Sequence, residues 1–161
     1  MEAGAEGARN KMREFCSLHI ESNSEPALPD FLFRKKSNIK VSFTDNESPE
    51  RIASFKRLAS HGVFKRQALP RYRWSFDSDN IDIKAGIYEH VFWILNQINP
   101  GILLYQINDL GFDCKLQYFW KGDGEGHGPI VTEKVSDLLV LHRIDIQFGF
   151  YYCNNTTTNF R

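Results

Sequence analysis

The sequence of 161 residues contains no long apolar run, because its longest, at 91–95 and 138–141, have four or five residues. A membrane-spanning helix needs about 20 consecutive apolar residues, so we expect none here. Residues 1–11 also lack the apolar stretch that a secretory signal requires. We therefore expect a cytoplasmic protein that does not have a membrane as its partner.

Cysteine is scarce, and the three that are present, Cys16, Cys114 and Cys153, form an odd set without CxxC spacing. This pattern favours reduced, buried thiols over disulfides. The sequence also lacks the GxSxG motif of serine hydrolases, the phosphate-binding GxxxxGK[ST] loop and the zinc-binding motif HExxH. We therefore predict a protein that is not an enzyme and has no cofactor.

The net charge is zero, with 20 basic and 20 acidic residues, but the two signs are segregated. Residues 31–73 contain 11 Lys or Arg against three acids, whereas residues 76–145 contain 11 acids against five bases. Either the two parts neutralise each other across the folded surface, or the basic part forms a binding surface. The candidate contact residues of such a basic face are Lys35, Lys36, Arg71 and Arg73.

The composition along the chain indicates one domain. Residues 1–11 are small and polar and suggest a disordered leader, with either Met1 or Met12 as the native start. Residues 12–153 have the length and apolar content of a single domain. Residues 154–161 form a polar tail.

Alternation of apolar and polar residues predicts strands at 15–20, 39–43, 71–77, 113–120 and 144–152. Residues 31–33 follow Pro29-Asp30 and could form one or two helical turns. Ser48-Pro49-Glu50 is a typical helix start, and we expect that helix to run to about Ser60.

Three further helices are expected. Apolar spacings of three and four predict one from a cap at Asp82 to just before Pro100. Residues 102–110 fit a strand or a helix, and Gly111 favours the helix because it stands where a left-handed cap belongs. The last runs from Thr132 to about Leu141. Mixed elements with half-polar strands predict an α+β fold, a single antiparallel sheet packed against helices on one face.

The last ninety residues resemble a bacterial family of unknown function, the one numbered 4279. The resemblance lies in the order of YRWSF, IYEHVFWILNQINP, ILLYQINDLG, CKLQYFW, GDGEGHG, VSDLLVLH and IDIQFGFYY, with landmarks at Trp74, Pro100, Gly111 and Gly128. The strand at 15–20 also fits, but residues 37–71 are longer and more basic than in that family. Small domains of this kind often accompany bacterial toxin systems as immunity proteins, and the resemblance carries that expectation.

The glycine-rich stretch 122–128 places Asp123, Glu125 and His127 at alternate positions. Two carboxylates and an imidazole can hold a divalent metal or supply an acid and a base, if the loop brings them together. The spacing does not match an EF-hand, and the glycines raise the entropic cost of ordering a site. The alternative is a plain connection between a strand and a helix, in which Asp123 and Glu125 are available to contact a partner.

The remaining candidates have structural alternatives. Trp74, beside two arginines, could stack on a nucleic-acid base, but it fits better as a core residue beneath a helix. His90 is expected at the polar edge of its helix, and His19 could meet a carboxylate across the sheet. The cysteines fall in strands, where packing is their usual role.

Taken together, these features predict a non-catalytic binding protein, most simply an immunity or accessory protein that binds and neutralises a cognate protein toxin. Blocking a partner needs only a complementary surface of about 800 Å² per protein. Two alternatives stay open: an RNA-binding module that uses the basic segment 31–73, and a metal-dependent enzyme that uses the loop 122–128.

Overall fold

The computed structural model describes residues 14–61, 69–79, 81, 86–122 and 128–152. The expected leader at 1–11, the tail at 154–161 and the three loop residues Asp123, Glu125 and His127 lie outside these ranges.

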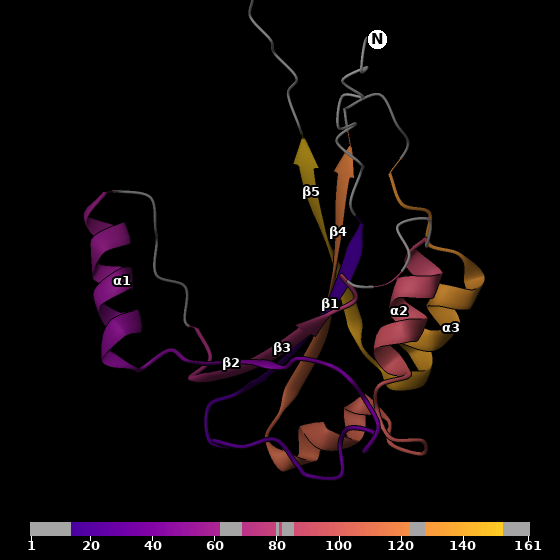
Figure 1. The fold of residues 1–161 in the computed structure, drawn as a ribbon, viewed down its shortest axis with the longest axis horizontal. Coiled ribbons are helices and arrows are strands. Elements are labelled where there is room, and N and C mark those ends of the chain that lie inside the picture. Colours follow the sequence, from indigo (N-terminus) through magenta and orange to yellow (C-terminus); the bar gives the residue numbers. More distant parts are fainter. Residues whose placement is uncertain (1–13, 62–68, 80, 82–85, 123–127, 153–161) are drawn as a thin grey trace, which may run out of the picture.

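The described chain forms one five-stranded sheet in the order β2-β3-β1-β4-β5 (Figure 1). The strands are β1 (Phe15–Ser22), β2 (Ser42–Asp45), β3 (Tyr72–Asp77), β4 (Asp113–Gly122) and β5 (Asp145–Tyr152). All neighbours pair antiparallel except β4 and β5, which pair in parallel. The predicted α+β fold is thus confirmed, and the sheet is mostly antiparallel.

The parallel pair is the one departure from the expected antiparallel sheet. Helix α3 (Glu133–His142) lies between β4 and β5 in sequence. It returns the chain to the end of the sheet at which β4 begins, so β5 runs in the same direction as β4. A parallel connection requires such a crossover, usually a helix. The strand alternation at 144–152 predicts the element but carries no information about its direction.

Strand β1 lies in the middle of the sheet and pairs on both sides. Its residue Leu18 stands opposite Phe76 on β3 and Leu116 on β4, and Leu116 in turn stands opposite Ile146 on β5. Because side chains alternate between the two faces of a strand, this row and its neighbours make one face of the sheet apolar.

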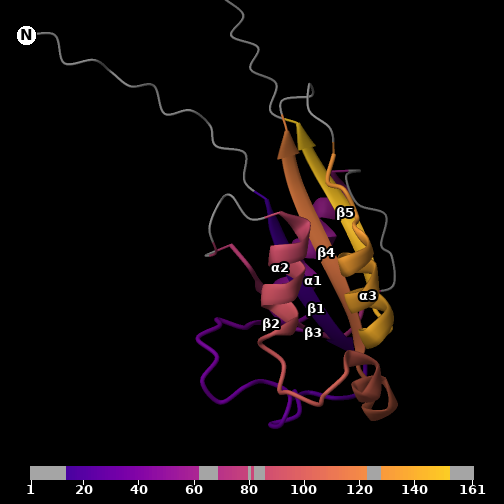
Figure 2. The same ribbon diagram turned by 90° about the vertical axis from the view of Figure 1, so that its right-hand side faces the viewer.

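Helices α2 (Ile87–Leu95) and α3 cover that apolar face side by side (Figure 2). Their inward residues, such as Val91, Ile94 and Val135, are fully buried against the strands. Burying each such side chain stabilises the fold by roughly 1.5–3 kcal/mol. Trp74 is only 6 % exposed, which confirms its predicted place in the core.

Two local predictions differ from the structure. Residues 31–33 form no helix; instead Phe33 makes an isolated antiparallel bridge with Ile98, just after α2. Helix α2 begins at Ile87 rather than after Asp82, with Gly86 in the capping position and its N–H donating to Glu89 Oε2 at 2.9 Å. The Glu89 carboxylate thus reaches back to the N–H of the capping residue. The expected cap Asp82 lies outside the described residues.

The segment 102–110 is helical, as Gly111 indicated, but as a 3-10 helix, η1 (Leu104–Leu110). Gly111 follows it with φ +89°, in the left-handed region. A Cβ at this position would lie 3.2 Å from Ser24 Oγ. Both the backbone conformation and the close approach therefore favour glycine here.

Helix α1 (Pro49–Ser60) matches its prediction, with Ser48 Oγ accepting from the Arg51 N–H at 3.4 Å. None of its twelve residues is buried. It stands apart from the sheet, on the side away from α2 and α3 (Figure 1). The described residues include no helix long and apolar enough to cross a membrane.

Replacing Gly111 tests the left-handed cap. Gly111→Ala should lower the free energy of unfolding by about 1–2 kcal/mol, because it adds backbone strain and presses on Ser24. Urea denaturation measures the change. Gly101→Ala is the matched control, since Gly101 has φ +86° but nothing within 4 Å of an added Cβ. A loss no larger at Gly111 than at Gly101 would show that the contact with Ser24 carries no cost.

Candidate functional site

The uncovered face of the sheet is polar and contains a cluster of charges. Glu21 on β1 is 6 % exposed and lies between two cations. Its Oε1 accepts from Arg73 Nε at 2.8 Å, and its Oε2 accepts from Lys115 Nζ at 2.7 Å. The Arg73 Nη2 atom also lies 2.5 Å from Oε1. Burial alone would raise the pKa of Glu21, but the hydrogen bonds and charges of Lys115 and Arg73 outweigh burial and hold that pKa below its usual value.

This cluster changes the interpretation of Arg73, which was expected on a basic face open to a partner. Its guanidinium is held by a buried carboxylate, so its charge is compensated within the molecule. Arg71 lies 3.3 Å from Glu47 and 3.9 Å from Asp45, and it also covers the Tyr72 ring at 4.8 Å. Both strand arginines are therefore engaged by acids from the same chain.

The structure also separates the strand arginines from the two lysines. Lys35 and Lys36 are exposed in the segment beside Arg34 and Phe33, and the Phe33 ring meets the helix-side residue Phe76 edge-on at 5.5 Å. The side chain of Arg73 lies on the opposite face, with Glu21. The four residues thus do not form a single basic face.

The exposed cations of the basic segment lie in two places, at Lys35, Lys36 and Lys40 and on helix α1. Arg51, Lys56 and Arg57 are all exposed on this helix, and so are the apolar residues Ile52 and Leu58. Sequence reasoning identified the helix and placed it in the basic segment 31–73, but it named none of the helix residues as binding candidates. The signal that could have indicated one is the low apolar content of α1, which offers little to bury in a core.

His19 lies on the polar face between Ser75 and Lys115. Its two ring nitrogens are buried, and the side chain of Gln117 on β4 is the polar group that interacts with the ring. Burial, and next to it the charge of Arg73, lowers the pKa of His19. The ring is thus neutral at pH 7 and its nitrogens are shielded from any substrate.

A buried serine–histidine pair lies on the other face. Ser78 Oγ is 2.7 Å from His90 Nδ1, and it also accepts from the Cys16 N–H at 2.8 Å. His90 is 1 % exposed, so its expected position at the polar edge of α2 is wrong. The hydroxyl supplies the polar contact that allows the imidazole to be buried. Neither side chain is open to a substrate.

The two described cysteines are poor nucleophiles. Burial raises the pKa of Cys16 far above its ordinary value, and burial, followed by the charge of Asp113, raises the pKa of Cys114 to about 12. Both therefore stay thiols at pH 7, whereas the thiolate is the reactive form. Their packing role in β1 and β4 agrees with the expectation.

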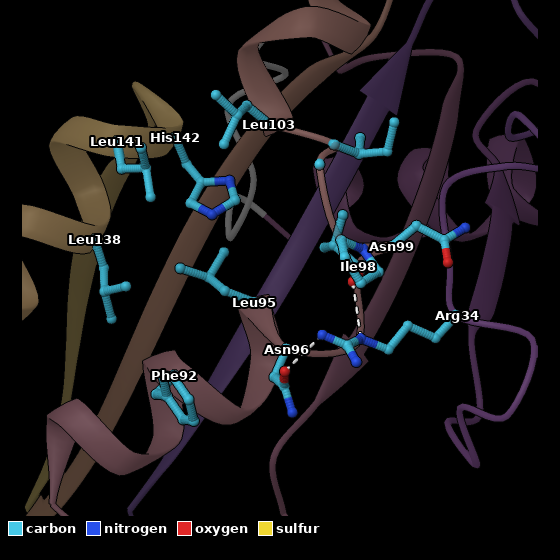
Figure 3. A pocket seen from close by; sticks show the side chains of 13 residues that line it. Arg34, Phe92, Leu95, Asn96, Ile98, Asn99, Leu103, Leu138, Leu141 and His142 are labelled. Carbon is cyan, nitrogen blue, oxygen red and sulfur yellow. Dashed lines mark hydrogen bonds between the residues drawn. The ribbon is translucent and has the colours of Figure 1, made fainter.

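A pocket of about 230 Å³ lies where α2, α3 and the segment before η1 meet (Figure 3). Leu95, Leu138 and Leu141 line its apolar side, and Arg34 and His142 approach it from different elements. Ligand pockets commonly measure about 300–1,000 Å³, so this one is small.

The polar groups of this pocket are already used to join its walls. Arg34 donates from Nη2 to Asn96 Oδ1 at 2.8 Å and from Nε to the Ile98 carbonyl at 3.2 Å. His142 Nδ1 accepts from the Leu104 N–H at 3.2 Å. Because an N–H can only donate, the ring is neutral with its proton on Nε2. These bonds tie the 31–34 segment and η1 to the ends of the two helices.

Among the described residues, no three or more His, Cys, Asp or Glu side chains gather as they do in a metal site. Comparisons with protein families, with curated proteins and with solved structures find nothing that matches this chain.

Replacing Glu21 tests the charge cluster. Glu21→Gln should lower the free energy of unfolding at pH 7 by about 1–3 kcal/mol, because Arg73 and Lys115 lose their shared acceptor. Since the folded-state pKa is lowered, the stabilisation is present above the unfolded pKa and is lost as the pH falls through the folded pKa. The variant should therefore lose stability less steeply below about pH 4.5. Urea denaturation at several pH values measures both effects.

The matched control is Glu47→Gln, which removes an exposed partner of Arg71 and should cost about 0–1 kcal/mol. An equal cost at the two positions would contradict a special role for Glu21.

His142 predicts a second pH dependence, at milder acidity. Burial lowers its pKa, so the unfolded chain binds a proton more readily than the folded one. Stability should then be full above about pH 6.5 and fall as the pH drops below it. His142→Gln should reduce this slope, with the remainder due to His19. The exposed His61→Gln serves as the control, and an unchanged slope in the His142 variant would refute the assignment.

Proposed function

We propose that the protein acts by non-covalent binding of an acidic protein partner, with α1 as its main recognition element. The observation that carries this proposal is that α1 has no buried residue and stands apart from the sheet. A helix that contributes nothing to the core is free to contribute its surface to another protein. The basic segment 31–73 would then contribute its exposed helix to binding an acidic protein.

The chemistry of α1 supports a protein as the partner. Lys56 and Arg57 would pair with carboxylates, while Ile52 and Leu58, each about 40 % exposed, would enter an apolar groove. An amphipathic helix in a groove is a common recognition mode. Lys35 and Lys36 are exposed as well and would add to the contact if the partner extends to them. The acidic candidates Asp123 and Glu125 lie outside the described residues, so the contact includes neither.

A nucleic acid is the less favoured partner. Trp74 is buried and cannot stack on a base, and the charges of Arg71 and Arg73 are compensated by Glu47 and Glu21. A single-strand binder combines a basic groove with exposed aromatic platforms. The apolar residues of α1 would also remain unused on a phosphate backbone.

The specific role that we propose is that of an immunity or accessory protein, which covers the working surface of a cognate toxin in the cytoplasm. This part of the proposal rests only on the resemblance to the family numbered 4279 that the order of elements suggests, since the comparison with protein families finds no match. An inhibitor of this kind needs complementary shape and charge but no reactive group, and we propose no catalysis for the protein.

Reversing one charge on α1 tests the proposal. Lys56→Glu and Arg57→Glu should each slow association with the partner about tenfold at low salt and flatten its salt dependence, because steering acts mainly on the association rate. The partner is isolated from the native host as the protein that the wild-type chain captures. Surface plasmon resonance at two salt concentrations gives the rates.

Lys134→Glu is the control, since it makes the same charge change on α3 and should leave the rates within about twofold. Equal effects at the three positions would contradict docking through α1. Capture of RNA that is lost steeply with salt, instead of a protein, would replace the proposal by the nucleic-acid alternative.

A further inference from the structure

The outer edge of β5 is unlike an ordinary sheet edge. β5 hydrogen-bonds to β4, and no strand lies on its other side in the described part of the chain. The strand has eight residues, DIQFGFYY, with one charge, Asp145, and neither lysine nor proline. Natural proteins protect their open edges with short strands, lysine, proline or bulges. β5 has none of these protections, so its edge is suited to pairing.

A groove lies at the start of this edge, between α3 and the first two residues of β5. It measures about 770 Å³ and is lined by Ser136, Leu139, Val140, Arg143, Ile144, Asp145 and Ile146. Val140 is 76 % exposed, and Phe148, further along β5 on the helix side, is 37 % exposed. A strand added at the edge would direct every second side chain to the helix side, and those opposite Asp145 and Ile146 would lie over this groove.

We propose that a second copy of this chain occupies the edge, with the two β5 strands antiparallel across a twofold axis. A twofold interface requires a surface that complements itself. Two identical strands in antiparallel pairing meet this requirement, because each supplies the donors and acceptors that the other lacks. The result is a continuous ten-stranded sheet with both α3 helices on one face.

The exposed stripe of α3 has the self-complementary chemistry that this arrangement needs. Glu133, Ser136 and Val140 follow the three–four spacing of one helix face. Arg143 is the left-handed cap that ends the helix, and its guanidinium lies 4.5 Å from the centre of the Tyr105 ring. It would have to leave that ring to reach a second copy. When two copies lie antiparallel about the middle of the helix, Val140 meets the small Ser136 of the second copy. Glu133 then meets Arg143 of the second copy, and both contacts occur twice. Antiparallel helices also set opposite dipole ends side by side.

The helix pairing and the strand pairing can share one twofold axis, because their centres lie at the same height along α3 and β5. The middle of α3, near Leu138, lies about 7.5 Å from its end at 1.5 Å per residue. The same distance along β5 at about 3.4 Å per residue leads from Asp145 to Gln147. One axis can therefore pass through the pairing of α3 with its copy and through a strand pairing centred on Gln147.

A pairing centred on Gln147 is also acceptable for the charges of the strand. Ile146 stands opposite Phe148 of the second copy, within the groove, and Asp145 stands opposite Gly149. The two Asp145 carboxylates are separated by about four residue positions, or roughly 13 Å, which exceeds the screening length of about 8 Å in physiological salt. The strand edges meet without like charges in contact.

Sedimentation velocity of the full chain from about 1 to 200 µM tests this inference. We expect a species of twice 18.7 kDa. Val140→Glu should weaken the dimer about tenfold or more, because it places two carboxylates in the centre of the interface. The monomer should still fold, since Val140 is largely exposed. Leu110→Glu, at an exposed apolar residue of η1, should leave the dimer intact.

A charge exchange makes the test specific for the antiparallel register. Glu133→Arg and Arg143→Glu should each weaken the dimer, and the double variant should recover most of the loss. A wild-type chain that is monomeric at 200 µM overturns the proposal. So does a dimer that Val140→Glu leaves intact, or a double variant without recovery.

The dimer is independent of the proposed binding role of α1. Lys56→Glu should dimerise like the wild type, and Val140→Glu should keep its association rate with the partner. Failure of one proposal therefore leaves the other standing.

Discussion

The pairing of β1 along both of its edges is the constraint on which the rest of the structure depends. β1 joins β3 on one side and β4 on the other, so it links the earlier part of the chain to the later part. One face of β1 carries Leu18 and Ile20, which anchor the core beneath α2. The other face carries Glu21, which holds Arg73 and Lys115 from the two neighbouring strands. The same strand thus sets the apolar and the polar half of the molecule.

The elements were predictable wherever a local pattern carries a strong physical signal. Ser48-Pro49 begins a helix because of capping and the fixed φ of proline, and Gly111 ends one because it accepts a left-handed backbone. Alternation placed the faces of β1, β3 and β4 correctly. The direction of β5 and the start of α2 were not predictable, because they depend on a crossover and on a contact with Glu89 rather than on local preference.

The candidate site was less predictable than the fold. A count of charges identifies the basic segment but cannot tell which cations are neutralised by their own chain. Arg73 is paired with Glu21, which lies 52 residues earlier in the sequence, and Arg71 is paired with Glu47. Only the register of the strands brings these groups together. The exposed cations of α1 emerge once the paired ones are set aside.

The central position of β1 has a consequence for synthesis of the chain on the ribosome. β1 is made first, but its second partner, β4, begins at Asp113, about 90 residues later. At roughly 5–20 residues per second, the strand waits some 5–20 s with an unsatisfied edge and an apolar face exposed. The nascent polypeptide therefore cannot complete its core until β4 has emerged, so the folding of this sheet is largely post-translational.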